Sequence, residues 1–144
     1  MKQSGIHVYK EREILIYGIG HDLLEIERIT AMIQKGIGAK LLQRILTEKE
    51  QVLAERRGGK AGEFAAGRFA AKEAVVKALG CGIGGQVGFQ DIEILPDGLG
   101  KPVVTLSAEA WARLDLPEGT GYTIHLTITH TREFASAFAV VESP

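Results

Sequence analysis

The stretch FAAKEAVVKALG, residues Phe69–Gly80, predicts a long alanine-rich helix that ends at a glycine. Glu73 and Lys77 lie four residues apart within it, so both side chains share one face of the helix. The glycine-rich run GCGIGG follows at Gly80–Gly85. A carboxylate and an ammonium group beside such a run could hold a divalent cation and a phosphate together. Such a pair is also typical of a solvent-exposed helix face, where it contributes little stability.

A second candidate carboxylate, Asp22, stands at the end of GIGHD, residues Gly18–Asp22. It follows an apolar segment, Glu13–Ile19, that is predicted to be a strand. The two glycines allow the backbone to turn sharply beside a bulky ligand. Asp22 is also a good N-cap and is expected to open a helix that ends near Gly36 and Gly38. Apolar residues recur in that helix at about helical spacing, at Leu23, Ile26, Ile29 and Ile33.

The remaining pattern places helices early in the chain and strands later. A helix is expected at Ala39–Leu46, another after Thr47, where Glu50 completes a capping box, and a third from Ser107 to Leu114. Gly67, among alanines of the main helix, suggests that a neighbouring element packs very close there. The predicted strands are Phe89–Leu95, Val103–Leu106, Tyr122–Thr129 and Phe134–Val141. This order indicates a single α+β domain.

Composition excludes several classes of protein. The chain has 144 residues, 45% of them hydrophobic, which is enough for one domain with a core. A net charge of -1 gives no general basic field for nucleic acid. No stretch approaches the roughly 20 apolar residues of a membrane helix, and residues 1–13 lack the apolar core of a signal peptide. The single cysteine, Cys81, fits a reducing compartment, so the expected location is the cytoplasm.

Two other kinds of site are disfavoured. The glycine run formally matches the dinucleotide fingerprint, but that motif follows a strand and opens a helix, whereas this run closes a helix. A simple helix C-cap is the ordinary explanation for it. The four histidines show no zinc-ligand spacing, so oxygen ligands and a hard cation such as Mg²⁺ are expected instead. These histidines are His7, His21, His125 and His130.

Four motifs occur in order along the chain: IYGIGHDLLEIERI (Ile16–Ile29), GRFAAKEAVVKALG (Gly67–Gly80), GKP (Gly100–Pro102) and ITHT (Ile128–Thr131). Together they resemble the holo-acyl-carrier-protein synthases, and the resemblance covers about residues 14–142. It implies a 4'-phosphopantetheinyl transferase fold at residues 14–144, with residues 1–13 as an N-terminal extension. It also implies the reaction, in which a serine of apo acyl carrier protein attacks the β-phosphate of coenzyme A and adenosine 3',5'-bisphosphate is released.

The resemblance assigns roles to individual residues. Asp22 and Glu73 are implied to hold Mg²⁺, while Glu73, Lys77 and His130 are implied to be catalytic. The family often has Asn before GKP, but Leu99 stands there, which puts a side-chain contact to the coenzyme in doubt. The general base stays open among Glu73, a water on the metal and a carboxylate of the carrier protein. The implied coenzyme contacts are Arg68, Lys77, Gly80, Lys101, Pro102, His130 and Thr131.

A basic stretch suggests a partner. Between Arg28 and Thr47 the chain carries four basic residues and no acidic one. A solvated face explains such a pattern, and so does a docking surface for an acidic protein. The resemblance supplies acyl carrier protein as that protein. The predicted docking residues are Arg28, Met32, Lys35 and Arg44, and Lys40 lies in the same stretch.

The strands suggest assembly. The segments FASAFAVV, residues Phe134–Val141, and ILIYGI, residues Ile14–Ile19, lack strict polar alternation, so both faces of their sheet could be covered. Either a neighbouring subunit or the chain's own helices could provide the cover. The resemblance implies a homotrimer with the coenzyme cleft between protomers.

Two rival functions are compatible with parts of the pattern. A non-catalytic module that binds an acidic protein or a nucleotide would need the basic stretch but not both carboxylates. A metal-dependent nucleotide hydrolase would turn over coenzyme A without any carrier protein.

Overall fold

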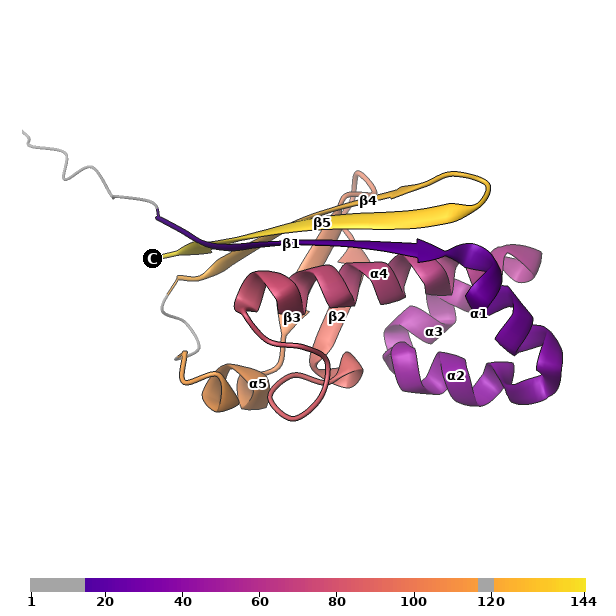
Figure 1. Cartoon of the computed structure of the whole chain (residues 1–144), viewed down its shortest axis with the longest axis horizontal. Helices are drawn as coiled ribbons and strands as arrows, with labels where there is room; N and C mark the ends of the chain where they lie inside the picture. Colours follow the sequence, from indigo (N-terminus) through magenta and orange to yellow (C-terminus); the bar gives the residue numbers. More distant parts are fainter. Residues whose placement is uncertain (1–14, 117–120) are drawn as a thin grey trace, which may run out of the picture.

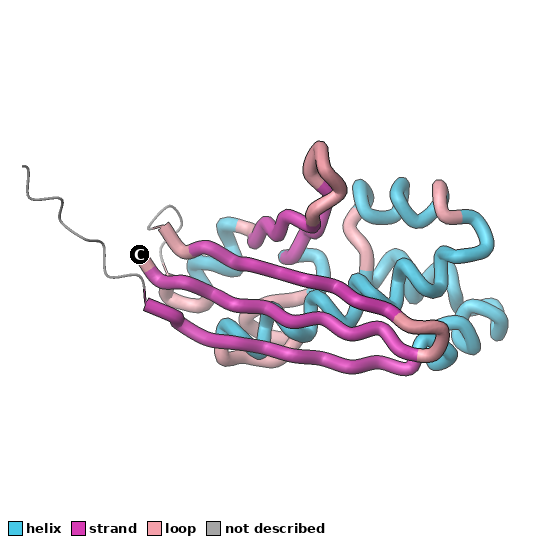
Figure 2. The backbone as a smooth tube through the Cα atoms, turned by 90° about the horizontal axis from the view of Figure 1, so that it is seen from above, coloured by secondary structure: helices cyan, strands magenta, loops and turns pink. Residues whose placement is uncertain are grey.

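The computed structural model describes residues 15–116 and 121–144, and its centre is one long helix lying on a sheet. Helix α4 (Ala61–Leu79) runs along one face of a three-stranded antiparallel sheet with strand order β1-β5-β4 (Figures 1 and 2). The predicted α+β class is confirmed. The strands of this sheet are β1 (Leu15–Glu25), β5 (Phe134–Ser143) and β4 (Thr123–His130).

Strand β1 and helix α4 approach each other at two glycines of the strand. A Cβ atom added at Gly18 or Gly20 would overlap the backbone carbonyl oxygens of Ala78 and Ala74. The alanines of α4 therefore reflect direct contact between backbones, which larger side chains would prevent. The expected close packing against this helix is confirmed, but it lies at Ala74 and Ala78, whereas a Cβ at Gly67 would meet only Ile128 at 3.4 Å.

Strand β1 continues beyond its predicted end. It runs through Asp22 to Glu25, and Asp22 pairs with Ala137 of β5. The prediction that Asp22 opens a helix is therefore wrong: helix α1 (Ile26–Met32) begins four residues later. The cause is the long ladder with β5, which overrides the local N-cap preference. The predicted strand start at Glu13, and the whole of the 1–13 extension, lie outside the described residues.

The helical segment beside α4 is divided into several parts. After α1 a π-helical turn, Ile33–Ile37, contains Gly36 at a φ of 81°, and helix α2 (Gly38–Ile45) follows. The predicted break near Gly36 and Gly38 is thus a kink. Helix α3 (Glu48–Glu55) has the predicted capping box, since the Thr47 amide donates to Glu50 Oε1 at 2.8 Å and the Glu50 amide to Thr47 Oγ1 at 3.3 Å.

The second half of the chain forms a hairpin and a short helix before returning to the main sheet. The predicted strand from Phe89 starts later, because Phe89–Asp91 forms a 3₁₀ turn in which Asp91 accepts from the Gly88 amide at 2.8 Å. Ser107 caps the short helix as predicted, through the Ala110 amide at 3.1 Å. The elements are β2 (Ile92–Pro96), β3 (Pro102–Leu106) and α5 (Ala108–Arg113).

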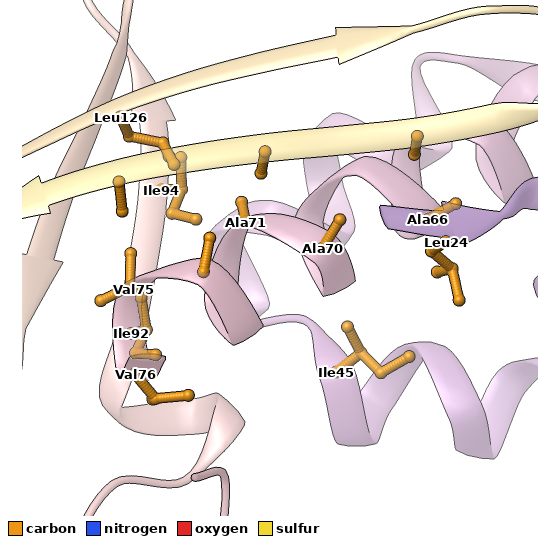
Figure 3. Close-up of a cluster of buried hydrophobic side chains, with 14 of the residues drawn as sticks. Leu24, Ile45, Ala66, Ala70, Ala71, Val75, Val76, Ile92, Ile94 and Leu126 are labelled. Atoms are coloured by element: carbon orange, nitrogen blue, oxygen red, sulfur yellow. The ribbon is translucent and has the colours of Figure 1, made fainter. Parts of the chain in front are cut away.

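The core lies between the main sheet, α4 and the hairpin. Figure 3 shows Val75 and Val76 of α4 beside Ile92 and Ile94 of β2, and all four side chains are fully buried. On the side of α4 away from the main sheet, the buried Ile45 of α2 completes the core. No helix within residues 15–116 and 121–144 is long and apolar enough to cross a membrane.

The outer face of the main sheet carries exposed apolar side chains. In β5 the residues Ala135, Ala137, Ala139 and Val141 are buried against α4, while Phe138 points away and is 42% exposed. In the described part of the chain the helices lie on one side of the sheet only (Figure 1). The alternative that the chain's own helices cover both faces is therefore wrong. Exposed on the open face are Ile19 and Leu23 of β1 with Phe134 and Phe138 of β5.

Candidate active site

Two carboxylates and a lysine meet where β1 crosses the C-terminal half of α4. Lys77 Nζ lies 3.1 Å from Asp22 Oδ1 and also donates to the carbonyl oxygen of His21 at 3.0 Å. Glu73 lies one helical turn before Lys77. The lysine thus pairs with the carboxylate of the strand, and the described residues provide no ion pair for Glu73. Asp22 lies in strand β1 and not at the start of a helix, and its place in that strand brings its side chain to Lys77 of α4.

The electrostatics of this cluster indicate a place for a cation. Partial burial and the neighbouring charge of Asp22 raise the pKa of Glu73, and Lys77 partly opposes this effect. Two nearby carboxylates with only one compensating ammonium group are a candidate site for a cation that prefers oxygen ligands. That donor set suits Mg²⁺, which binds through few protein groups and keeps several waters. Within the described residues there is no group of three or more His, Cys, Asp or Glu side chains that could hold a metal.

A basic cavity lies at the other end of α4. It has a volume of about 360 Å³, and its wall includes three of the implied coenzyme contacts, Arg68, Pro102 and His130. The side chain of Arg68 lies over the Phe64 ring, with Cζ 4.6 Å from the ring centroid. His130 Nε2 is 2.9 Å from Glu63 Oε1. The other basic groups in the wall are Arg57 and Lys60.

The two groups of residues do not converge within one chain. Arg68 and Lys77 are nine residues apart on α4, which corresponds to about 14 Å along the axis and about two and a half turns. Their side chains therefore leave the helix on opposite sides. The structure brings Asp22, Glu73 and Lys77 together at one place and Arg68, Pro102 and His130 together at another.

The remaining predicted coenzyme contacts are Gly80, Thr131 and Lys101. Gly80 adopts a φ of 82° as the C-cap of α4, so the C-cap interpretation of the glycine run is confirmed at this position. The Thr131 hydroxyl accepts from the Phe134 amide at 3.1 Å in the turn between β4 and β5. Lys101 is exposed beside the cavity residues Gly100 and Pro102.

The hairpin tip before Lys101 differs from the family pattern at Leu99. Its side chain is 96% exposed. Asp97 Oδ1 organises the tip by accepting from the amides of Leu99 and Lys101, each at 2.9 Å. An asparagine at position 99 is therefore not needed to hold this turn.

Several residues of the basic cavity were missed by sequence reasoning. Lys60, Glu63 and Phe64 stand three or four residues from one another or from the predicted Arg68, which places them near Arg68 on one side of the helix. That periodicity was available in the sequence. The contribution of Pro96 from a distant strand was not, because it depends on tertiary packing.

The predicted docking residues all lie on the surface. Arg28 and Met32 are one turn apart on α1, and Lys35 follows in the π-helical turn. Arg44 is exposed on α2, a separate helix. The structure thus places three of the four residues on one continuous helical segment and the fourth beyond the Gly36 kink.

Comparisons with known proteins cover nearly the whole chain. A family model described as the 4'-phosphopantetheinyl transferase superfamily matches residues 18–139. The chain is 47% identical over 131 residues to the holo-[acyl-carrier-protein] synthase of Bacillus cytotoxicus, covering 90% of this chain and 98% of that protein.

Solved structures give the same picture. A holo-(acyl-carrier-protein) synthase from Bacillus anthracis in complex with CoA (3',5'-ADP) matches with a TM-score of 0.73 and 44% identity, over 90% of this chain and 98% of that one. The holo-[acyl-carrier-protein] synthase from Neisseria meningitidis matches with a TM-score of 0.77 and 37% identity, over 90% of this chain and all of that one.

Proposed function

The chain belongs to the 4'-phosphopantetheinyl transferase superfamily, and from this premise we propose that it acts as a Mg²⁺-dependent holo-acyl-carrier-protein synthase. The supporting observation is the similarity to such enzymes over nearly the full length of a chain that also brings Asp22, Glu73 and Lys77 together. Coenzyme A is the donor and apo acyl carrier protein is the acceptor. The serine hydroxyl of the carrier loses its proton to a general base, and its oxygen forms a bond to the β-phosphorus of coenzyme A. The bond from that phosphorus to the oxygen of the α-phosphate breaks, and that oxygen leaves with adenosine 3',5'-bisphosphate.

The carboxylate cluster and the basic cavity have different proposed roles in the reaction. Asp22 and Glu73 would hold Mg²⁺, which when bound supplies positive charge against the pyrophosphate oxygens. Lys77 is half-exposed and reaches the same place as a point cation for the leaving adenosine 3',5'-bisphosphate. Arg68 and His130 would bind phosphate oxygens in the basic cavity, which has the donors that such groups need.

A coenzyme site shared between two copies of the chain would account for the separation of the carboxylate cluster from the basic cavity. If the coenzyme lies between two copies of the chain, the carboxylate cluster of one copy and the basic cavity of the next could reach one ligand. The open apolar face of the sheet, with Ile19, Leu23 and Phe138, gives the surface on which copies would associate. A contact between two different patches closes into a ring when the rotation from copy to copy closes, and the family resemblance implies such a ring of three. The proposed assembly is a homotrimer.

The transfer can be tested directly. Incubating the protein with apo acyl carrier protein, coenzyme A and Mg²⁺ is expected to add the mass of one phosphopantetheine to the carrier, as measured by mass spectrometry. Omitting Mg²⁺ should prevent the gain. A nucleotide hydrolase would consume coenzyme A without a carrier, and a binding module would give no mass change, so either result would contradict the proposal.

Docking of the carrier protein gives a second prediction. Arg28→Glu is expected to raise the KM for carrier protein by about tenfold, with less than a twofold change in the KM for coenzyme A, because a surface charge acts mainly on association. The effect should shrink at high salt. Lys49→Glu is the matched control, since Lys49 is exposed on α3 outside the basic stretch. Equal effects of Arg28→Glu on both KM values would place Arg28 outside the docking surface.

A further inference from the structure

The buried carboxylate of Glu50 lies close to two basic residues of α4, Arg68 and Lys72. Glu50 has no exposed surface, and its Oε1 accepts from Lys72 Nζ at 2.6 Å and from the Thr47 amide at 2.8 Å. Its Oε2 accepts from the Ile94 amide at 3.0 Å and lies 3.8 Å from Arg68 Nε. Glu50 therefore joins α3, α4 and β2 at a single carboxylate.

Arg68 connects this buried carboxylate to the basic cavity. Its Nε donates to the Ile94 carbonyl oxygen at 3.2 Å, so Glu50 and Arg68 bind the two backbone polar groups of the same residue, Ile94. The side chain of Arg68 is 11% exposed, and the residue lines the cavity. Nε is thus fixed on the inner side, while the planar guanidinium keeps its terminal donors for a ligand.

The charges around Glu50 are unequal. Lys72 has no exposed surface and also donates to the carbonyl oxygens of Ile45 and Phe89, at 2.7 and 2.9 Å. Burial lowers the pKa of Lys72 and of Arg68, and the charge of Glu50 opposes this for both. Without Glu50, these two largely buried cations would repel each other and lose their nearest counter-charge, since Glu93 acts on Lys72 more weakly than Glu50 does. Arg68, which is nearer to the surface, would be the one to move.

We propose that Glu50 is a positioning residue for coenzyme binding, which holds the Arg68 guanidinium in the cavity wall in the orientation that a phosphate group needs. This inference rests on the proposed function, in which Arg68 contacts the coenzyme. Glu50 itself does not touch the ligand. Its effect passes through the direct approach to Arg68 and through the backbone of Ile94, which both side chains bind.

The test separates positioning from stability by comparing two partners of the same ion pair. Glu50→Gln removes the charge that faces Arg68, whereas Lys72→Met removes the other cation and leaves Glu50 beside Arg68. Both variants are expected to melt at lower temperature. Only Glu50→Gln is expected to weaken the binding of adenosine 3',5'-bisphosphate to the full-length protein, by about tenfold in titration calorimetry, as for the loss of an oriented charged hydrogen bond. In turnover, its KM for coenzyme A should rise while its KM for carrier protein stays within twofold.

A double variant covers the case in which Glu50→Gln does not fold. Glu50→Gln with Lys72→Met removes both members of the buried pair and leaves no unpaired buried lysine. It should show the same tenfold loss of nucleotide binding. Normal binding by a folded Glu50→Gln or double variant, or an equal loss in Lys72→Met, would overturn the inference.

Arg68→Ala distinguishes this inference from the proposal beneath it. Arg68→Ala should weaken nucleotide binding at least as much as Glu50→Gln. If Arg68→Ala binds normally, the proposed coenzyme contact is wrong and the role of Glu50 fails with it. If Arg68→Ala weakens binding and Glu50→Gln does not, only the role of Glu50 is wrong.

Discussion

Replacing Asp22 or Glu73 by alanine is expected to lower the turnover number for carrier-protein modification by about a thousandfold or more, the scale on which loss of a charge-stabilising group acts in a transferase. Each replacement leaves a single carboxylate to hold Mg²⁺. The residual activity should require far more Mg²⁺ than the unmodified protein does. The measurement is the initial rate of carrier mass gain over a Mg²⁺ series.

Thermal melting without metal provides the control for this prediction. Partial burial, and after it the neighbouring charge of Asp22, raise the pKa of Glu73, and Lys77 is only half-buried in its pair with Asp22. Removing either carboxylate therefore should cost little stability. Asp22→Asn and Glu73→Gln keep the shape of the side chains and should be nearly as inactive as the alanine variants. Near-normal turnover of any of these variants at limiting Mg²⁺ would show that the metal assignment is wrong.

Local patterns in the sequence predicted most elements of the fold. The Thr47 and Glu50 capping box, the Ser107 cap and the glycine that ends α4 all depend on residues within a few positions of one another. Such contacts between near neighbours in the chain can be predicted from the sequence alone. The π-helical kink at Gly36 was indicated only as a break, because a glycine signals freedom without specifying the conformation that follows.

The error at Asp22 has a different origin. Its local sequence satisfies the preference for a helix N-cap, but its position is decided by pairing with Ala137, 115 positions away in the chain. The paired carboxylate and lysine were expected to be Glu73 and Lys77, and the structure pairs Lys77 with Asp22 instead. Motif spacing identified the right neighbourhood, and only the strand register decides which carboxylate the lysine contacts.

Burial of charge was the least predictable feature. Glu50 was recognised as part of a capping box, yet the sequence gives no sign that it also binds Lys72 at a separation of 22 residues. The same holds for Arg68, whose contact with the hairpin depends on how β2 crosses α4. Long-range ion pairs in the core follow from packing, and packing is specified by the whole chain.

Two inactive variants are expected to restore activity when they are mixed, because the proposed trimer shares each site between neighbours. In the arrangement proposed above, Glu73 of one copy and His130 of the next act on one coenzyme. Glu73→Ala supplies an intact His130, and His130→Ala supplies an intact Glu73. After complete subunit exchange at equal amounts, each position is filled by either variant with equal chance, so about one quarter of the sites contain both intact residues. The expected rate is about one quarter of that of the unmodified protein, measured as carrier mass gain.

Phe138→Asp gives the control for assembly. Phe138 lies on the open face of the sheet and is paired across the strands with His21, next to Asp22. A charge at this position should prevent association, so light scattering should report a monomer, and transfer should be lost because the two clusters of one chain cannot reach one ligand. An unmodified protein that is monomeric at micromolar concentration would contradict the whole arrangement. A trimer whose mixed variants stay inactive would contradict only the sharing of Glu73 and His130, since a site built within one copy cannot be repaired by its neighbour.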